Sequence, residues 1–190
     1  MIQRIQNLYL IVAIAALITL TLGIEVYSYA IVKEQTTHLD VYVNSYGIQI
    51  DGTIDATAAS SDIASLQVFL NTQEELSEVK GVAYNKFPFF SITLFLTMLT
   101  IATLLTFKKL PTQLRFGRMA FFFSLLATIF TIVFYYVLKS EFSDVVENGE
   151  VASYLGLGFF CLIIATAFIF LANIGIKRDL DLIKSIDRIR

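Results

Sequence analysis

Four apolar blocks without a charged residue alternate with polar segments along the chain. They span residues 5–24, 87–107, 119–138 and 151–176. Each block provides about 20 residues, the number that an α-helix needs to cross roughly 30 Å of hydrocarbon. The blocks are apolar on all sides, whereas surface helices of soluble proteins keep a polar face. The pattern therefore predicts an all-α integral membrane protein whose fold is a bundle of four transmembrane helices.

Composition agrees with this class of protein. Hydrophobic residues make up 56% of the 190 residues and charged residues only 16%, which argues against a cytosolic enzyme, a disordered tail or a DNA-binding module. The first block has a second interpretation as a cleavable signal peptide preceded by Arg4. Its apolar run is long for a signal peptide, so we expect an uncleaved first span.

Charge sets the expected orientation. If the chain crosses the membrane at each of the four blocks, ten basic and three acidic residues lie on one side. Four basic and thirteen acidic residues then lie on the other side. The basic excess belongs on the cytoplasmic side, which puts both termini in the cytoplasm. The ten residues of this expected cytoplasmic basic face are Arg4, Lys108, Lys109, Arg115, Arg118, Lys177, Arg178, Lys184, Arg188 and Arg190.

The segments between the blocks complete a single membrane domain over residues 1–190. Residues 108–118 are expected to be a basic cytoplasmic loop, and residues 139–150 a short extracytoplasmic loop. Residues 177–190 form an amphipathic cytoplasmic tail. The tail either lies on the anionic inner leaflet, docks on a partner or continues the fourth helix.

The segment 25–86 is too long for a simple connection, and we expect a small β-containing extracytoplasmic domain. Apolar and polar residues alternate over 27–32 and again over 41–50, where Asn44-Ser45-Tyr46-Gly47 supplies the turn of a hairpin. Residues 62–79 fit a strand or a helix, and we favour a strand followed by a helical turn. The residues expected to anchor this domain on the helix ends are Tyr27, Tyr29, Tyr42 and Tyr46.

Small residues recur at helical spacing in every block. Such stripes let helices approach closely in lipid, although small residues are also common in any membrane helix. The expected helix-packing residues are Ala13, Ala16 and Gly23 in the first block, Thr93, Thr97 and Thr100 in the second, Ser124 and Ala127 in the third, and Gly158, Cys161 and Ala165 in the fourth.

The sequence shows no set of residues that would indicate ion transport, catalysis or metal binding. The blocks contain no Asp, Glu, Lys, Arg or His, which argues against a pump or an ion-coupled transporter. No catalytic, metal or nucleotide motif occurs, Cys161 is the only cysteine, and His38 with Asp40 falls short of a metal site. We therefore expect no cofactor, no metal and no nucleic-acid partner.

Two functions fit these observations. The first is a non-enzymatic accessory or assembly subunit that contacts membrane lipids and partner membrane proteins, and no pattern indicates its oligomeric state. The second is a bundle that binds or processes a lipid or another hydrophobic ligand. Its groove would be lined by Thr93, Thr97, Thr100, Ser124 and Thr131.

The ends of the chain carry a resemblance. Met1-Ile2-Gln3-Arg4-Ile5-Gln6, Leu8-Tyr9-Leu10, Phe107-Lys108 and the closing stretch from Lys184 to Arg190 resemble the DUF4293 family. The resemblance implies a small four-helix inner-membrane protein of Bacteroidetes-type bacteria and transfers no catalytic residue. Pro111 departs from the more continuously basic middle loop of that family. The order of one helix, a long β-bearing segment and three helices is also similar to claudin-like tetraspan proteins, whose paired loop cysteines are absent here.

Overall fold

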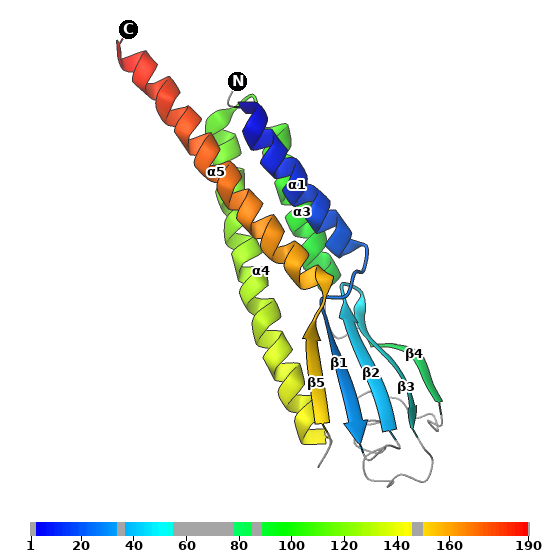
Figure 1. Ribbon diagram of the computed structural model, residues 1–190. Coiled ribbons are helices and arrows are strands. Elements are labelled where there is room, and N and C mark those ends of the chain that lie inside the picture. The colour runs from blue at the N-terminus through cyan, green and yellow to red at the C-terminus, as the bar shows by residue number, and fades with distance from the viewer. Residues whose placement is uncertain (1–2, 34–36, 55–77, 85–88, 146–149, 190) are drawn as a thin grey trace. The chain divides into compact units, whose positions relative to one another are not determined.

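The computed structural model describes residues 3–33, 37–54, 78–84, 89–145 and 150–189 (Figure 1). Two compact units make up the chain. The first, the helical unit, comprises Met1–Leu22, Phe90–Phe130 and Phe160–Arg190. The second, the sheet unit, comprises Gly23–Phe89 and Thr131–Phe159.

Four helices form, as the apolar blocks predict. They are α1 (Gln3–Thr21), α3 (Phe89–Leu105), α4 (Leu110–Val145) and α5 (Leu157–Ile189). By length and composition, α4 and α5 are long and apolar enough to cross a membrane, while α1 and α3 are shorter apolar helices. These segments are rich in β-branched and aromatic residues, yet they form helices, so their context overrides their preference for strands.

Seven buried residues drawn from all four helices form the core of the helical unit. They are Ala13, Leu17, Leu96, Ala120, Ala127, Ala165 and Ile169. Four of the seven are alanines, and small side chains let helix backbones approach closely. Larger side chains such as Phe121 and Phe168 are only partly buried around this core.

The expected loop over residues 108–118 is mostly helical. Only a short turn after Leu105 separates α3 from α4, which begins at Leu110. Pro111 is compatible with this start because the first turn of a helix needs no backbone N–H from it. Leu110 and Leu114 are buried in a small cluster with Ile176, and this packing extends α4 beyond the apolar block.

The expected loop over 139–150 and the start of the fourth block also differ from the structure. Helix α4 runs to Val145, and residues 150–155 form the strand β5 (Glu150–Leu155) instead of a helix. The helix α5 then begins at Leu157 and continues to Ile189. Of the three interpretations of the tail, the structure therefore shows continuation of the last helix.

The sheet unit contains five antiparallel strands in the order β4-β3-β2-β1-β5 (Figure 1). The first four are β1 (Tyr27–Lys33), β2 (Thr37–Asn44), β3 (Gly47–Ile54) and β4 (Glu78–Tyr84). These four strands lie between α1 and α3 and confirm a small sheet in the long polar segment. The fifth strand, β5, pairs with β1 in a register that sets Tyr27 opposite Leu155.

The predicted hairpin is confirmed as β2 and β3. Asn44 pairs with Gly47, which leaves Ser45 and Tyr46 as the loop, and the Asn44 Oδ1 accepts hydrogen bonds from the amides of Tyr46 and Gly47. Such a side-chain acceptor stabilises the turn locally. His38 lies in β2. Of the segment 62–79, in which we expect a strand and a helical turn, residues 62–77 lie outside the described residues, and the last two residues belong to β4, which begins at Glu78.

The connection from β5 into α5 closes against the chain that enters β1. The amide of Gly156 donates to the carbonyl of Val26 at 2.9 Å, and the amide of Gly158 donates to the carbonyl of Glu25 at 2.7 Å. A Cβ atom on Gly156 would overlap the Glu25 carbonyl, and one on Gly158 would lie 2.8 Å from the same oxygen. Backbone therefore packs on backbone here, and only glycine leaves the necessary space.

The first prediction concerns this contact. The substitution Gly156→Ala should lower the free energy of unfolding by about 1–3 kcal/mol, because the added methyl group must displace backbone atoms of Glu25. Thermal unfolding of the purified protein in detergent measures the change. Gln49→Ala, at an exposed position of β3, is the control. An unchanged melting temperature for Gly156→Ala would contradict the described packing.

Candidate functional site

A buried hydrogen bond joins the first and the last helix of the helical unit. Gln6 Nε2 donates to Asp179 Oδ2 at 2.6 Å, and both side chains are buried. Gly175 makes room for the Gln6 side chain, since a Cβ atom there would lie 2.7 Å from Gln6 Cγ. Next to Asp179 in sequence, Leu180 packs on the cluster that includes Leu110. The pair fixes the lateral position of α1 against α5.

Two acceptors near this end of α5 lack partners among the described residues. They are Asp179 Oδ1 and Asn173 Oδ1, and both are buried. The amide nitrogen of Asn173 donates to the Gly117 carbonyl at 2.8 Å. A buried acceptor without a partner costs about 1–3 kcal/mol, and more when it is charged. The side-chain amide of Gln6 is the only donor to the Asp179 carboxylate in the described part of the chain. Loss of this donor should therefore destabilise the bundle.

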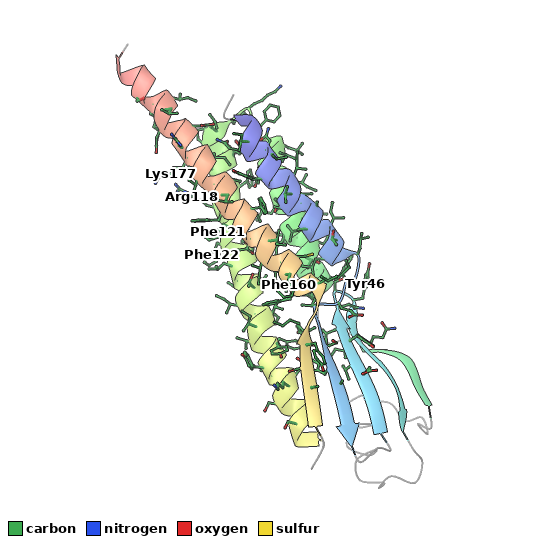
Figure 2. The ribbon with its side chains drawn as sticks, in the orientation of Figure 1. Tyr46, Arg118, Phe121, Phe122, Phe160 and Lys177 are labelled. Atoms are coloured by element: carbon green, nitrogen blue, oxygen red, sulfur yellow. The ribbon has the colours of Figure 1, made fainter. Side chains whose placement is uncertain are left out.

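The expected basic face contributes only exposed side chains where the structure describes it. These are Lys108, Lys109, Arg115, Arg118, Lys177, Arg178 and Lys184. Figure 2 labels Arg118 on α4 and Lys177 on α5. The side chains of Arg4, Arg188 and Arg190 lie outside the described residues. Exposed, flexible cations of this kind suit contact with anionic surfaces.

The expected helix-packing residues fall into three groups. Those buried in the helical unit are Ala13, Thr93, Thr97, Thr100, Ser124, Ala127 and Ala165. Ala16 and Cys161 are half-buried. Gly23 and Gly158 belong to the sheet unit.

Gly23 is a correction to the expected packing face of α1. The helix ends at Thr21, and Gly23 has a φ of 93°. A Cβ atom on Gly23 would overlap the ring of Tyr46. A left-handed backbone conformation just after a helix end favours glycine, so Gly23 serves to end α1.

Four of the five hydroxyl groups expected to line a ligand groove, those of Thr93, Thr97, Thr100 and Ser124, donate within their own helices. Thr97 donates to the Thr93 carbonyl and Thr100 to the Leu96 carbonyl, each at 2.7 Å. Ser124 donates in the same way to the Phe121 carbonyl at 2.9 Å. All four residues are buried, and so is Thr131, the fifth, which belongs to the sheet unit.

Tyrosines form the centre of the sheet unit. The rings of Tyr27, Tyr29 and Tyr135 lie with centroids 5.6–5.8 Å apart. The Tyr29 hydroxyl donates to the backbone carbonyl of Tyr135 at 2.8 Å, and the Tyr135 hydroxyl donates to Ser153 Oγ at 2.8 Å. Two of the four expected anchors, Tyr27 and Tyr29, are thus buried against α4, whereas Tyr46 is 54% exposed.

A pocket of about 220 Å³ lies beside this cluster. Its lining residues are Tyr27, Ile132, Tyr135, Tyr136, Leu155 and Phe159. The Tyr27 hydroxyl is buried and has no hydrogen-bond partner among the described residues. Burial raises the pKa of Tyr27, and burial followed by the electrostatic influence of Tyr27 and Tyr135 raises the pKa of Tyr29. Both hydroxyls are therefore neutral donors at physiological pH.

Comparison with known proteins decides the family. The family model DUF4293, described as a domain of unknown function, matches residues 2–189. The chain belongs to the DUF4293 family. No curated protein matches the chain. The match confirms the resemblance carried by the two ends of the sequence, and it assigns no site residue.

The sequence of this DUF4293 protein points only weakly to its buried polar residues. Gln6 stands in the N-terminal stretch that carries the family resemblance, and Asp179 is the one acid directly after Lys177-Arg178. Tyr135 and Tyr136 mark the end of an apolar block, where tyrosine is common at a membrane interface. Among the described residues, no group of three or more His, Cys, Asp or Glu residues could hold a metal ion.

The second prediction tests the Gln6–Asp179 pair of the DUF4293 protein. Gln6→Ala should lower the free energy of unfolding by about 1–3 kcal/mol, because it leaves both oxygens of a buried carboxylate without a donor. A double-mutant cycle uses wild type, Gln6→Leu, Asp179→Leu and the double variant Gln6→Leu/Asp179→Leu. The double variant should lose less than the two single leucine variants together, since no polar group is then stranded. Thermal unfolding of the four proteins gives the coupling energy.

Asp181→Ala is the matched control, because Asp181 is an exposed acid on the same helix. Its effect should stay within about 0.5 kcal/mol. Strictly additive losses in the Gln6 and Asp179 variants would show that the two residues do not interact.

Proposed function

We propose that this DUF4293 protein is a multi-pass protein of the bacterial inner membrane that crosses the bilayer four times. The main support is the outward direction of its apolar side chains. In the most apolar 18-residue stretch of each helix, only 22% of the residues of α4 and 33% of those of α5 are buried. The core helix of a soluble protein would be mostly buried. Phe122 on α4 and Phe160 on α5 are exposed and can be followed in Figure 2.

The shorter helices support spans as well. With 19 and 17 residues, α1 and α3 are about 28 and 26 Å long, close to the thickness of the hydrocarbon layer. Both contribute to the core of the helical unit. Both also expose large apolar side chains on their other faces, among them Ile5, Leu8, Ile11, Phe95 and Met98. An outward apolar face on a helix packed in a bundle suits contact with lipid.

Charge supports an orientation with both termini in the cytoplasm. The exposed cations of the α3–α4 turn and of the last third of α5 belong to the helical unit. The Gln6–Asp179 hydrogen bond joins the beginning of α1 to the same part of α5. Cations at one end of a bundle favour the cytoplasmic side.

Within the membrane we propose a non-enzymatic role as an accessory or assembly subunit. The buried hydroxyls of Thr97, Thr100 and Ser124 already donate to carbonyls of their own helices, so their protons serve the bundle itself. Beyond Lys177, the last turns of α5 expose Leu182 and Ile183, each to 47%. Since α5 is continuous there, these apolar residues stand away from the hydrocarbon layer and suit contact with a partner protein.

The third prediction tests the topology. Cys161→Ala provides a cysteine-free background, into which Gln49→Cys and Ser185→Cys are introduced separately at exposed positions. A membrane-impermeant maleimide should label Gln49→Cys in intact spheroplasts and Ser185→Cys only after lysis. Labelling of both cysteines in intact spheroplasts, or recovery of the chain as a soluble monomer without detergent, would contradict the proposal.

The fourth prediction tests the role of subunit. Purification in several mild detergents, followed by mass spectrometry, should recover a stoichiometric companion protein. The double variant Leu182→Lys/Ile183→Lys should lose this companion while remaining folded, because both side chains are already exposed. Ser185→Ala on the same turns is the control. A lone monomer in every detergent would count against the subunit role and leave the membrane topology standing.

A further inference from the structure

A groove of about 460 Å³ follows one face of α5 at the end of its apolar block. Its lining residues are Ile174, Lys177, Arg178, Asp181, Leu182 and Ser185. They recur every three or four positions, which is the spacing of one face of a helix. All six side chains are exposed, so the groove is open to a ligand along its length. It belongs entirely to the helical unit.

The chemistry of the lining changes in a fixed order along the helix. Ile174 lies within the apolar block and is 50% exposed. Lys177 and Arg178 follow about one turn later, and Asp181 comes about one turn after them. Each turn advances about 5.4 Å along the helix axis. The groove therefore presents an apolar side chain, then two cations and then a carboxylate, and Lys177 can be followed in Figure 2.

The charged groups of the groove are available to a ligand. Lys177, Arg178 and Asp181 make no hydrogen bond or ion pair within the described part of the chain. The neighbouring Asp179 is buried against Gln6 and does not line the groove, so Asp181 is its only acidic lining residue. Exposed charges of both signs in this order favour a ligand that carries a negative group and a positive group about one helical turn apart.

The position of the groove along α5 indicates which molecule meets it. On the topology proposed above, on which this step rests, the end of the apolar block lies at the inner interface between hydrocarbon and headgroups. A phospholipid at this level has its acyl chains beside the apolar block, its phosphate next and the end of its headgroup outermost. Ethanolamine ends in an ammonium group, which gives the lipid the charge order that complements the groove. A glycerol headgroup lacks this cation and leaves Asp181 without a countercharge.

We propose that this groove binds the headgroup of phosphatidylethanolamine from the inner leaflet. The upper part of an acyl chain packs on Ile174, and the side chains of Lys177 and Arg178 donate to the phosphate. The ammonium group of the ethanolamine donates to the Asp181 carboxylate. The Ser185 hydroxyl already donates to the Leu182 carbonyl at 2.7 Å, so the polar contacts of the lipid are with the three charged residues.

The experiment compares three lipids that share their acyl chains and differ in the headgroup. The full-length protein is delipidated in detergent and titrated with phosphatidylethanolamine, phosphatidylglycerol or phosphatidylcholine. Phosphatidylglycerol lacks the cation, and phosphatidylcholine keeps the cation but lacks its N–H donors. Native mass spectrometry measures the binding of each lipid. Wild-type protein should bind phosphatidylethanolamine about two- to fivefold more tightly than either of the other lipids, the effect of one exposed ion pair.

Variants at exposed positions assign the preference to the groove. Asp181→Asn keeps the size of the side chain and removes its charge, so it should abolish the preference for phosphatidylethanolamine over phosphatidylglycerol. The double variant Lys177→Gln/Arg178→Gln should weaken the binding of all three lipids, because each of them carries the phosphate. Lys184→Gln is the matched control, since Lys184 is an exposed cation on the same helix and does not line the groove.

Two results would overturn the proposal. One is wild-type protein that binds phosphatidylglycerol as tightly as phosphatidylethanolamine, and the other is an Asp181→Asn variant that keeps the wild-type preference. Neither result bears on the cysteine labelling of Gln49→Cys and Ser185→Cys. Labelling as expected, together with either result, would leave the membrane topology intact and remove only the lipid site.

Discussion

Pairing of the buried threonine hydroxyls with carbonyls of their own helix is the interaction on which the helical unit depends. Thr97, Thr100 and Thr103 each donate a hydroxyl to a carbonyl one turn earlier in α3, so the faces that meet in the core need no water. Once these groups are paired, alanines such as Ala120 and Ala165 can bring helices close together. The large apolar side chains are then left on the outside of the bundle, which suits the membrane location that we propose.

Features that are encoded locally could be predicted from the sequence. The absence of charge over about 20 residues marks each apolar helix, and Asn44 to Gly47 specify the turn between β2 and β3 without help from distant residues. Strand β5 could not be found in this way. Glu150 to Leu155 lead directly into an apolar helix, and their extended conformation depends on pairing with β1, a segment from the other end of the chain. The early start of α4 likewise depends on packing of Leu110 and Leu114 against Ile176.

Buried polar residues of the candidate sites were hidden from the sequence for a related reason. A count of charges treats Asp179 like any acid outside the apolar blocks, yet its burial follows from the approach of Gln6, 173 positions earlier. Gly175 permits the close approach of Gln6, and Gly117 that of Asn173. A glycine in a helix, however, does not indicate from the sequence which residue packs against it. Tyr27 could be placed in a strand by alternation, whereas the missing partner of its hydroxyl appears only when Tyr29 and Tyr135 surround it.

The long-range contacts of both units require the last part of the chain, β5 and α5. The β2–β3 hairpin can form as soon as its residues are made, because its loop contains only Ser45 and Tyr46. Strand β1 gains its second neighbour only when β5 follows α4, and α1 gains its buried hydrogen bond only when α5 brings Asp179 to Gln6. Contacts between distant segments form late because closing long loops costs entropy before any contact repays it. Both units therefore remain incomplete until α5 and the strand before it are in place, so the C-terminal third of this DUF4293 protein stabilises each of them.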